Sequence, residues 1–125
     1  MSLQVTSQPK ALDTFVVSLA GSLNSNTAIL LKKELDSFVD KSTKLILFNL
    51  ENLGYLSSAG IRVFLKVRKT LEKNDGNIAF VNIQPQVRKV FKIINSIPSI
   101  TIFQSIEELD DYLDEIRRQV LEGNK

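Results

Sequence analysis

Two adjacent serines, Ser57 and Ser58, stand where a strand-like segment gives way to a helix-like one, and Gly60 follows them. A serine hydroxyl at such a junction can cap the helix by accepting a hydrogen bond from one of its first N–H groups. It can also serve as a nucleophile, or it can accept a phosphate from a protein kinase. The remainder of the chain discriminates among these three roles.

The nucleophile is the role that the sequence disfavours most. The chain contains no histidine and no cysteine, which removes disulfides, thiolate zinc sites, cysteine nucleophiles and every histidine-based triad. Residues 56–60 lack the first glycine of the Gly-x-Ser-x-Gly elbow, and no Ser-x-x-Lys pattern accompanies them. Phosphate-loop and EF-hand spacings are also missing. We therefore expect no enzymatic activity, no catalytic residue, no metal and no cofactor.

The composition is that of one soluble globular domain. Hydrophobic residues make up 43% of the 125 positions and charged residues 24%, while the net charge of +2 gives no push toward nucleic acid or an anionic membrane. The longest apolar runs fall far short of the roughly 20 residues of a membrane helix, and the start lacks a signal-peptide pattern. We predict a cytoplasmic protein with a single domain over residues 1–125, its tail frayed from about residue 121.

Strand and helix patterns alternate along the chain. Strands are predicted at residues 15–21, 44–50, 77–83 and 100–103, with a weaker candidate at 3–7. Helices are predicted at residues 28–39, 60–71, 85–94 and 109–120, with Asn24 or Ser25 capping the first and Ser105 with Glu108 the last. The order β-β-α-β-α-β-α-β-α predicts an α/β fold, a mixed β-sheet of four to five strands with about four helices packed on it.

A phosphate at the serine junction would be compatible with the fold. The helix N–H groups and the positive end of the helix dipole stabilise a nearby anion by roughly 0.3–1 kcal/mol. Arg62 lies one helical turn beyond Ser58, within reach of such a phosphate. The same charge pushed into an apolar or acidic interface is strongly unfavourable. Phosphorylation would therefore displace a docked partner and leave the fold intact.

Charged side chains gather on two of the predicted helices. Arg62, Lys66, Lys69 and Lys73 share one face of the helix after Ser58. No aromatic residues interleave with them, so a solvated face is favoured over a nucleic-acid surface, and an acidic protein partner would also suit it. The last helix begins with several acids, and this acidic surface is a candidate second interaction surface or homodimer contact, with a solvated face as the default.

The segment LILFNLENLGYLSSAGIRVFL resembles the core signature of the STAS domain, the family named for sulfate transporters and anti-sigma factor antagonists. LAGSLNSNTAILLKKEL resembles the Gly-x-Leu-Asp segment of that family with its first helix. VNIQPQVRKVFKIINSIPSITIF is similar to its later helix and last strand. The resemblance spans nearly the whole chain. It implies a STAS fold and a likeness to the free-standing bacterial anti-sigma factor antagonists.

Members of that branch bind an anti-sigma factor, often itself a serine kinase, and are released when it phosphorylates them; a PP2C-type phosphatase reverses the step. The resemblance implies Ser58 as the phosphate acceptor and Gly60 as the motif glycine, with Ala59 in place of the second Ser or Thr. Ser57 and Asn24 stand where the family carries Asp. The implied partner surface comprises Asn24, Ser57, Ser58, Ala59, Gly60 and Arg62. Two alternatives stay open: Ser57 as the acceptor, and a STAS scaffold or adaptor that is never phosphorylated.

Overall fold

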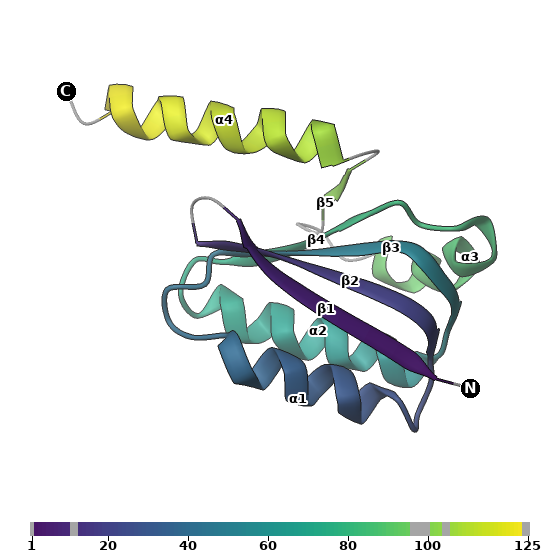
Figure 1. The fold of residues 1–125 in the computed structure, drawn as a ribbon. Coiled ribbons are helices and arrows are strands. Elements are labelled where there is room, and N and C mark those ends of the chain that lie inside the picture. The colour runs from purple at the N-terminus through teal and green to yellow at the C-terminus, as the bar shows by residue number, and fades with distance from the viewer. Residues whose placement is uncertain (1, 11–12, 96–100, 104–105, 124–125) are drawn as a thin grey trace.

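The computed structural model describes residues 2–10, 13–95, 101–103 and 106–123, and it confirms the predicted order of elements (Figure 1). The elements are β1 (Leu3–Lys10), β2 (Thr14–Leu23), α1 (Ala28–Phe38), β3 (Leu45–Leu56), α2 (Ser58–Glu72), β4 (Asn77–Val81), α3 (Pro85–Asn95), β5 (Thr101–Phe103) and α4 (Ile106–Gly123). Ile100 and Ser105, which were predicted to begin the last strand and to cap the last helix, lie outside the described residues.

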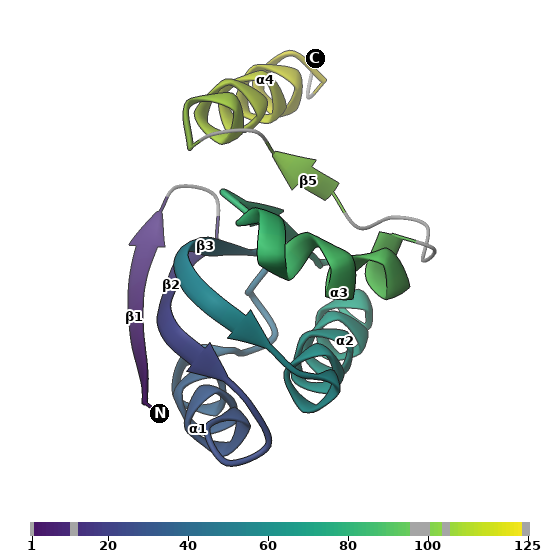
Figure 2. The same ribbon diagram turned by 90° about the vertical axis from the view of Figure 1, so that its right-hand side faces the viewer.

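The five strands form the predicted mixed sheet, and their order in it is β1-β2-β3-β4-β5. β1 is antiparallel to β2, and every later pair is parallel. Each parallel step is a strand–helix–strand unit, and such crossovers are right-handed almost without exception. Because the chain advances across the sheet in one direction, the crossover helices pack into a common core, whereas α4 lies beyond the opposite face (Figures 1 and 2).

Four phenylalanines form the centre of the core under α2. Phe48, Phe64, Phe80 and Phe91 come from β3, α2, β4 and α3 and are almost completely buried. The ring centroids of Phe48 and Phe64 are 4.7 Å apart, and those of Phe64 and Phe80 are 5.0 Å apart. Tilted and edge-on ring pairs at these distances add to the free energy of burial. The cluster therefore fixes α2 against the middle of the sheet.

A second apolar layer covers the other face of the sheet. Leu47, Ala79 and Val81 are fully buried there, while their neighbours Ile46 and Phe48 belong to the main core. Side chains alternate between the two faces of a strand, so a strand buried on both faces must be apolar at every position. This accounts for the unbroken apolar run that predicted the central strand.

The structure extends β1, β2 and β3 beyond their predicted ends and shortens β4. β3 runs to Leu56, although its sequence pattern predicted an end at Leu50. Its last residues stay paired with β2 through two register shifts, which carry the strand on to the pair Leu23 with Leu56. β4 ends at Val81, because Asn82 has a positive φ of 60° and leaves the strand. The extension of β3 brings its end beside the end of β2.

No helix in the described part of the chain is both long enough and apolar enough to cross a membrane.

Candidate functional site

The two serines at the junction occupy different environments. Ser57 is the N-cap of α2: its backbone is extended, with φ −100° and ψ 170°, and its Oγ accepts a hydrogen bond from the N–H of Gly60 at 3.4 Å. The predicted capping role is thereby confirmed for Ser57, which is half-buried. Ser58 is the first residue of the helix and is exposed. The geometry thus assigns the structural role to one hydroxyl and leaves the other accessible to solvent.

Gly60 lets the start of α2 approach the sheet closely. It is buried, and a Cβ atom at this position would lie 2.6 Å from Cγ of Leu23 and 2.7 Å from Cδ1 of Leu56. Both leucines are themselves buried, so a larger residue would force their side chains or the start of α2 to move. The predicted close packing of the helix start is confirmed, while the predicted role of Gly60 in the approach of a partner stays a prediction. Ala59 is half-buried and packs against the core.

The loop between β2 and α1 lies beside the serine junction, as predicted for Asn24. The N–H of Ser57 donates to the carbonyl oxygen of Leu23 at 2.9 Å, which ties the end of β2 to the start of α2. Asn24 follows directly and is half-buried. Arg62 is exposed one turn into α2, so the structure brings the loop, the serines and the first turn of α2 to one edge of the sheet.

The predicted N-cap of α1 is wrong. Neither Asn24 nor Ser25 is the cap residue; Thr27 is, with helical backbone angles and no side-chain capping bond. Asn24 acts one turn earlier: its Oδ1 accepts hydrogen bonds from the N–H groups of Asn26 at 2.9 Å and Thr27 at 3.0 Å. Such an Asx turn offers the same backbone donors an acceptor before the helix starts. Asn24 therefore holds the loop that borders the junction.

Replacing Asn24 by alanine should lower the free energy of unfolding by about 1 kcal/mol, because two backbone N–H groups lose their acceptor. Urea unfolding followed by circular dichroism measures the change. Asn26→Ala is a matched control, since Asn26 is exposed and contributes only its backbone N–H to the turn. Equal midpoints for the two variants would show that the Asn24 side chain does not hold the loop.

Three large apolar side chains at this edge are exposed, and no sequence pattern predicted them. Ile29 is 57% exposed and Leu30 49%, both in the first turn of α1, and Tyr55, near the end of β3, is 49% exposed. Exposed apolar groups gathered in one region are typical of protein interaction sites. Their only sequence signal is that Ile29 and Leu30 lie between the core residues Ala28 and Leu31, which makes four consecutive apolar residues, more than one core-facing side of a helix needs.

The groups at this edge are suited to binding an anion. Ser58 presents a hydroxyl at the N-terminus of a fifteen-residue helix, where backbone N–H groups and the dipole favour negative charge. The exposed guanidinium of Arg62 lies one turn further along. Within the described ranges, no group of three or more Asp, Glu, His or Cys residues is placed to hold a metal ion. A phosphate on Ser58 would therefore meet donors and positive potential.

Comparison with known proteins finds a matching family model and relatives named as anti-sigma factor antagonists. The model of the STAS domain matches residues 3–109. The proposed anti-sigma factor antagonist BtrV of Bordetella bronchiseptica is 40% identical over 78 residues, which cover 62% of this chain and 67% of BtrV. The anti-sigma-B factor antagonist of Staphylococcus aureus is 27% identical over 93 residues, covering 74% of this chain and 83% of that protein.

Solved structures of SpoIIAA, an anti-sigma factor antagonist and Bacillus cell fate determinant, share the fold. The unphosphorylated form superimposes with a TM-score of 0.70 at 21% identity, covering 91% of this chain and 98% of SpoIIAA. The phosphorylated form gives a TM-score of 0.69 at 22% identity, covering 87% and 99%. The five-stranded sheet and its helices therefore follow a known architecture over most of the chain.

Proposed function

The chain belongs to the STAS domain family, and from that premise we propose that it is an anti-sigma factor antagonist. It binds an anti-sigma factor that has serine kinase activity. It is released when that kinase phosphorylates Ser58. The observation that carries the proposal is the position of Ser58, exposed at the start of α2. Release of the antagonist would leave the anti-sigma factor able to hold its sigma factor, and a PP2C-type phosphatase would restore binding. Such a cycle operates in the cytoplasm, where transcription occurs.

The division of labour between the serines supports Ser58 as the acceptor. Ser57 is half-buried and its Oγ faces the N–H of Gly60, so a kinase would have to remove a helix cap in order to modify it. Ser58 needs no such rearrangement, because its hydroxyl makes no contact on which the fold depends. A kinase that reaches this edge of the sheet would therefore modify Ser58 first.

The surroundings of Ser58 support release without unfolding. At the helix N-terminus a phosphate stabilises the fold by roughly 0.3–1 kcal/mol, and Arg62 is available to it. A docked partner would cover the exposed Ile29, Leu30 and Tyr55. It would also displace the water around Ser58. A dianion deprived of water in such an interface destabilises the complex. The same modification is thus tolerated by the domain and unfavourable for the complex.

The second candidate is a scaffold or adaptor of the STAS family that signals by assembly alone. Asn24 and Ser57 favour it, because they carry no charge where the family pattern has Asp. A kinase that recognises those carboxylates would find none at these two positions. The exposed apolar side chains would then bind a partner permanently, without a switch.

Phosphorylation of the purified chain separates the two candidates. The chain is incubated with ATP and a candidate anti-sigma factor that has serine kinase activity. We expect a mass gain of one phosphate that maps to Ser58, that persists in Ser57→Ala and that is lost in Ser58→Ala. Absence of modification, together with unchanged partner binding by Ser58→Ala and Ser58→Asp, would favour the scaffold.

A further inference from the structure

We propose that the groove between α1 and α2 docks an acidic amphipathic helix of the protein that binds at Ser58. The inference rests on the proposed function in one respect only, namely that the docked helix belongs to the same partner. The groove has a volume of about 80 Å³. Its lining consists of apolar side chains from both helices, namely Leu35, Val39, Val63 and Val67, and of polar ones, namely Lys32, Asp36, Lys66 and Thr70.

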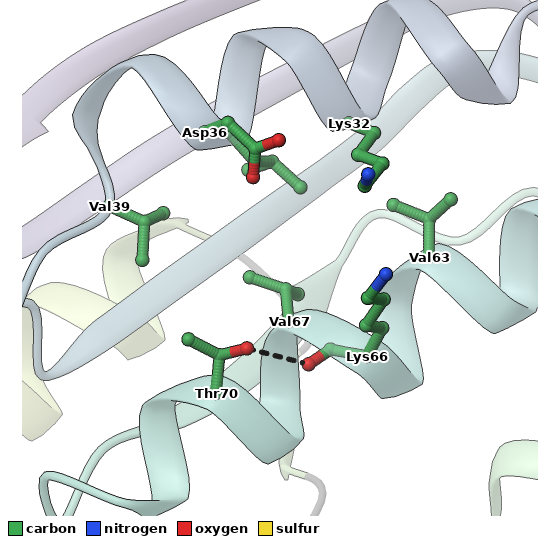
Figure 3. A pocket seen from close by; sticks show the side chains of 8 residues that line it. Lys32, Asp36, Val39, Val63, Lys66, Val67 and Thr70 are labelled. Atoms are coloured by element: carbon green, nitrogen blue, oxygen red, sulfur yellow. Dashed lines mark hydrogen bonds between the residues drawn. The ribbon is translucent and has the colours of Figure 1, made fainter.

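The groove has a basic end and an apolar floor (Figure 3). Lys32 of α1 and Lys66 of α2 point toward each other across it, beside Val63. Val67 continues the floor, and Asp36 lies further along. The hydroxyl of Thr70 donates to the carbonyl oxygen of Lys66 at 3.1 Å, so it is already engaged within its own helix. The basic end therefore offers two ammonium groups on either side of an apolar strip.

The size and shape of the groove favour side chains of a protein over a small molecule. Pockets for drug-sized ligands enclose roughly 300–1,000 Å³, several times the volume between α1 and α2. A space of about 80 Å³ accommodates one or two apolar side chains. Two helices that flank a shallow apolar strip form the surface on which an amphipathic helix lays its apolar face, with anchors at i, i+3 and i+4.

The charge of α2 specifies an acidic occupant. Arg62, Lys66, Lys69 and Lys73 are all exposed and follow one another at steps of three or four residues along one face. Like charges at this spacing destabilise a helix by about 0.2–0.5 kcal/mol per pair. In residues 2–10, 13–95, 101–103 and 106–123, no carboxylate lies within 4.0 Å of any of these four cations. Carboxylates of a docked helix would neutralise this repulsion.

Nucleic acid fits the same face less well. Binding of single strands combines a basic groove with aromatic side chains on which bases stack, and the lining of this groove contains no aromatic residue. The apolar strip of Val63 and Val67 would remain unused by a polyanion.

The groove continues the surface around Ser58. The exposed apolar pair Ile29 and Leu30 lies in the first turn of α1, and Arg62 lies one turn after Ser58, before the groove begins. A partner helix that lies in the groove would thus bring its carboxylates toward the N-terminus of α2. A phosphate on Ser58 would repel them, since like charges in an interface oppose binding. The acidic helix therefore gives phosphorylation a direct means of releasing the partner.

Two synthetic amphipathic helices of about 15 residues test the proposal with the unphosphorylated chain. The peptides share one apolar face and carry Glu or Lys at the same flanking positions. We expect the Glu peptide to bind about tenfold more tightly than the Lys peptide, with an affinity that falls as salt is added. Methyl resonances of Leu35, Val63 and Val67 should shift during the titration.

Charge reversal provides the matched comparison. Lys32→Glu combined with Lys66→Glu should reverse the preference, so that the Lys peptide binds more tightly than the Glu peptide. Lys33→Glu combined with Lys89→Glu makes the same change of net charge at exposed positions outside the groove and should preserve the original preference. A reversal of preference cannot arise from loss of folding, because a misfolded chain would bind neither peptide selectively.

Equal binding of the two peptides by the unmodified chain would overturn the proposal. A single-stranded oligonucleotide that displaces the Glu peptide at a similar concentration would also overturn it, since the surface would then be a general polyanion site. The titration uses neither kinase nor ATP. A negative peptide titration therefore does not affect the test of Ser58 phosphorylation. Likewise, if the kinase does not phosphorylate Ser58, the peptide titration still tests the groove.

Discussion

The Ser58→Asp chain is expected to bind its anti-sigma factor about 100-fold more weakly than the unmodified chain, which corresponds to about 2.7 kcal/mol. An aspartate in the first turn of α2 is compatible with the fold, because the helix dipole stabilises it there. In the complex the same carboxylate loses water among apolar and partner side chains, and the desolvation of an unpaired charge is costly. Fluorescence anisotropy with labelled anti-sigma factor measures the affinity, and urea unfolding measures stability.

Two controls make this result specific. Ser58→Ala should bind as tightly as the unmodified chain and should resist release by kinase and ATP. Ser57→Asp introduces the same charge one residue earlier, but at the N-cap, where the carboxylate can accept the hydrogen bond from Gly60 that Ser57 now accepts. We expect its affinity to fall far less than that of Ser58→Asp. Similar losses for both aspartates would mean that the interface responds to total charge and not to Ser58.

The Phe64→Ala chain should lose about 3–5 kcal/mol of unfolding free energy, the largest effect on stability that we expect from one substitution near the site. Phe64 is completely buried, and its ring lies within 4.7 Å of the Phe48 centroid and 5.0 Å of the Phe80 centroid. Alanine would leave a cavity between α2 and the sheet and would remove these ring contacts. Since the free energy of unfolding of such a domain is about 5–15 kcal/mol, the loss is a large fraction of the total stability.

Urea unfolding of three variants measures this effect. Phe64→Leu fills part of the cavity and should cost less than Phe64→Ala. Tyr55→Ala also removes an aromatic ring, but from an exposed position, so its unfolding midpoint should change little. A midpoint for Phe64→Ala close to that of Tyr55→Ala would contradict the view that the aromatic cluster holds α2 in place.

The parts of the fold that sequence patterns predicted are those with strong local periodicity. The unbroken apolar run at the start of β3 and the stripe of Phe64, Val67 and Leu71 on α2 each report burial directly, so both elements were predicted correctly. The later part of β3 was not, because four of residues 51–55 are exposed and the register shifts against β2 break the alternation. Only pairing with a strand far away in sequence keeps that segment extended.

The site residues that the sequence predicted are likewise those that a local pattern marks, and the others depend on tertiary structure. Ser58 and Gly60 could be predicted because a short motif places them at a strand-to-helix junction. The cap of α1 could not, since Asn24 and Thr27 share hydrogen bonds whose assignment depends on loop geometry. The groove also escaped prediction, because Lys32 and Lys66 come from different helices and meet only when both pack on the sheet.

One measurement tests the central claim most directly: the affinity of the anti-sigma factor for the chain carrying a phosphate on Ser58 alone. We predict binding weaker by about 100-fold or more, an unchanged unfolding midpoint, and full recovery of affinity after treatment with a PP2C-type phosphatase. Equal affinities for the phosphorylated and unphosphorylated chains would contradict the account, because the added charge would then have no effect on the partner.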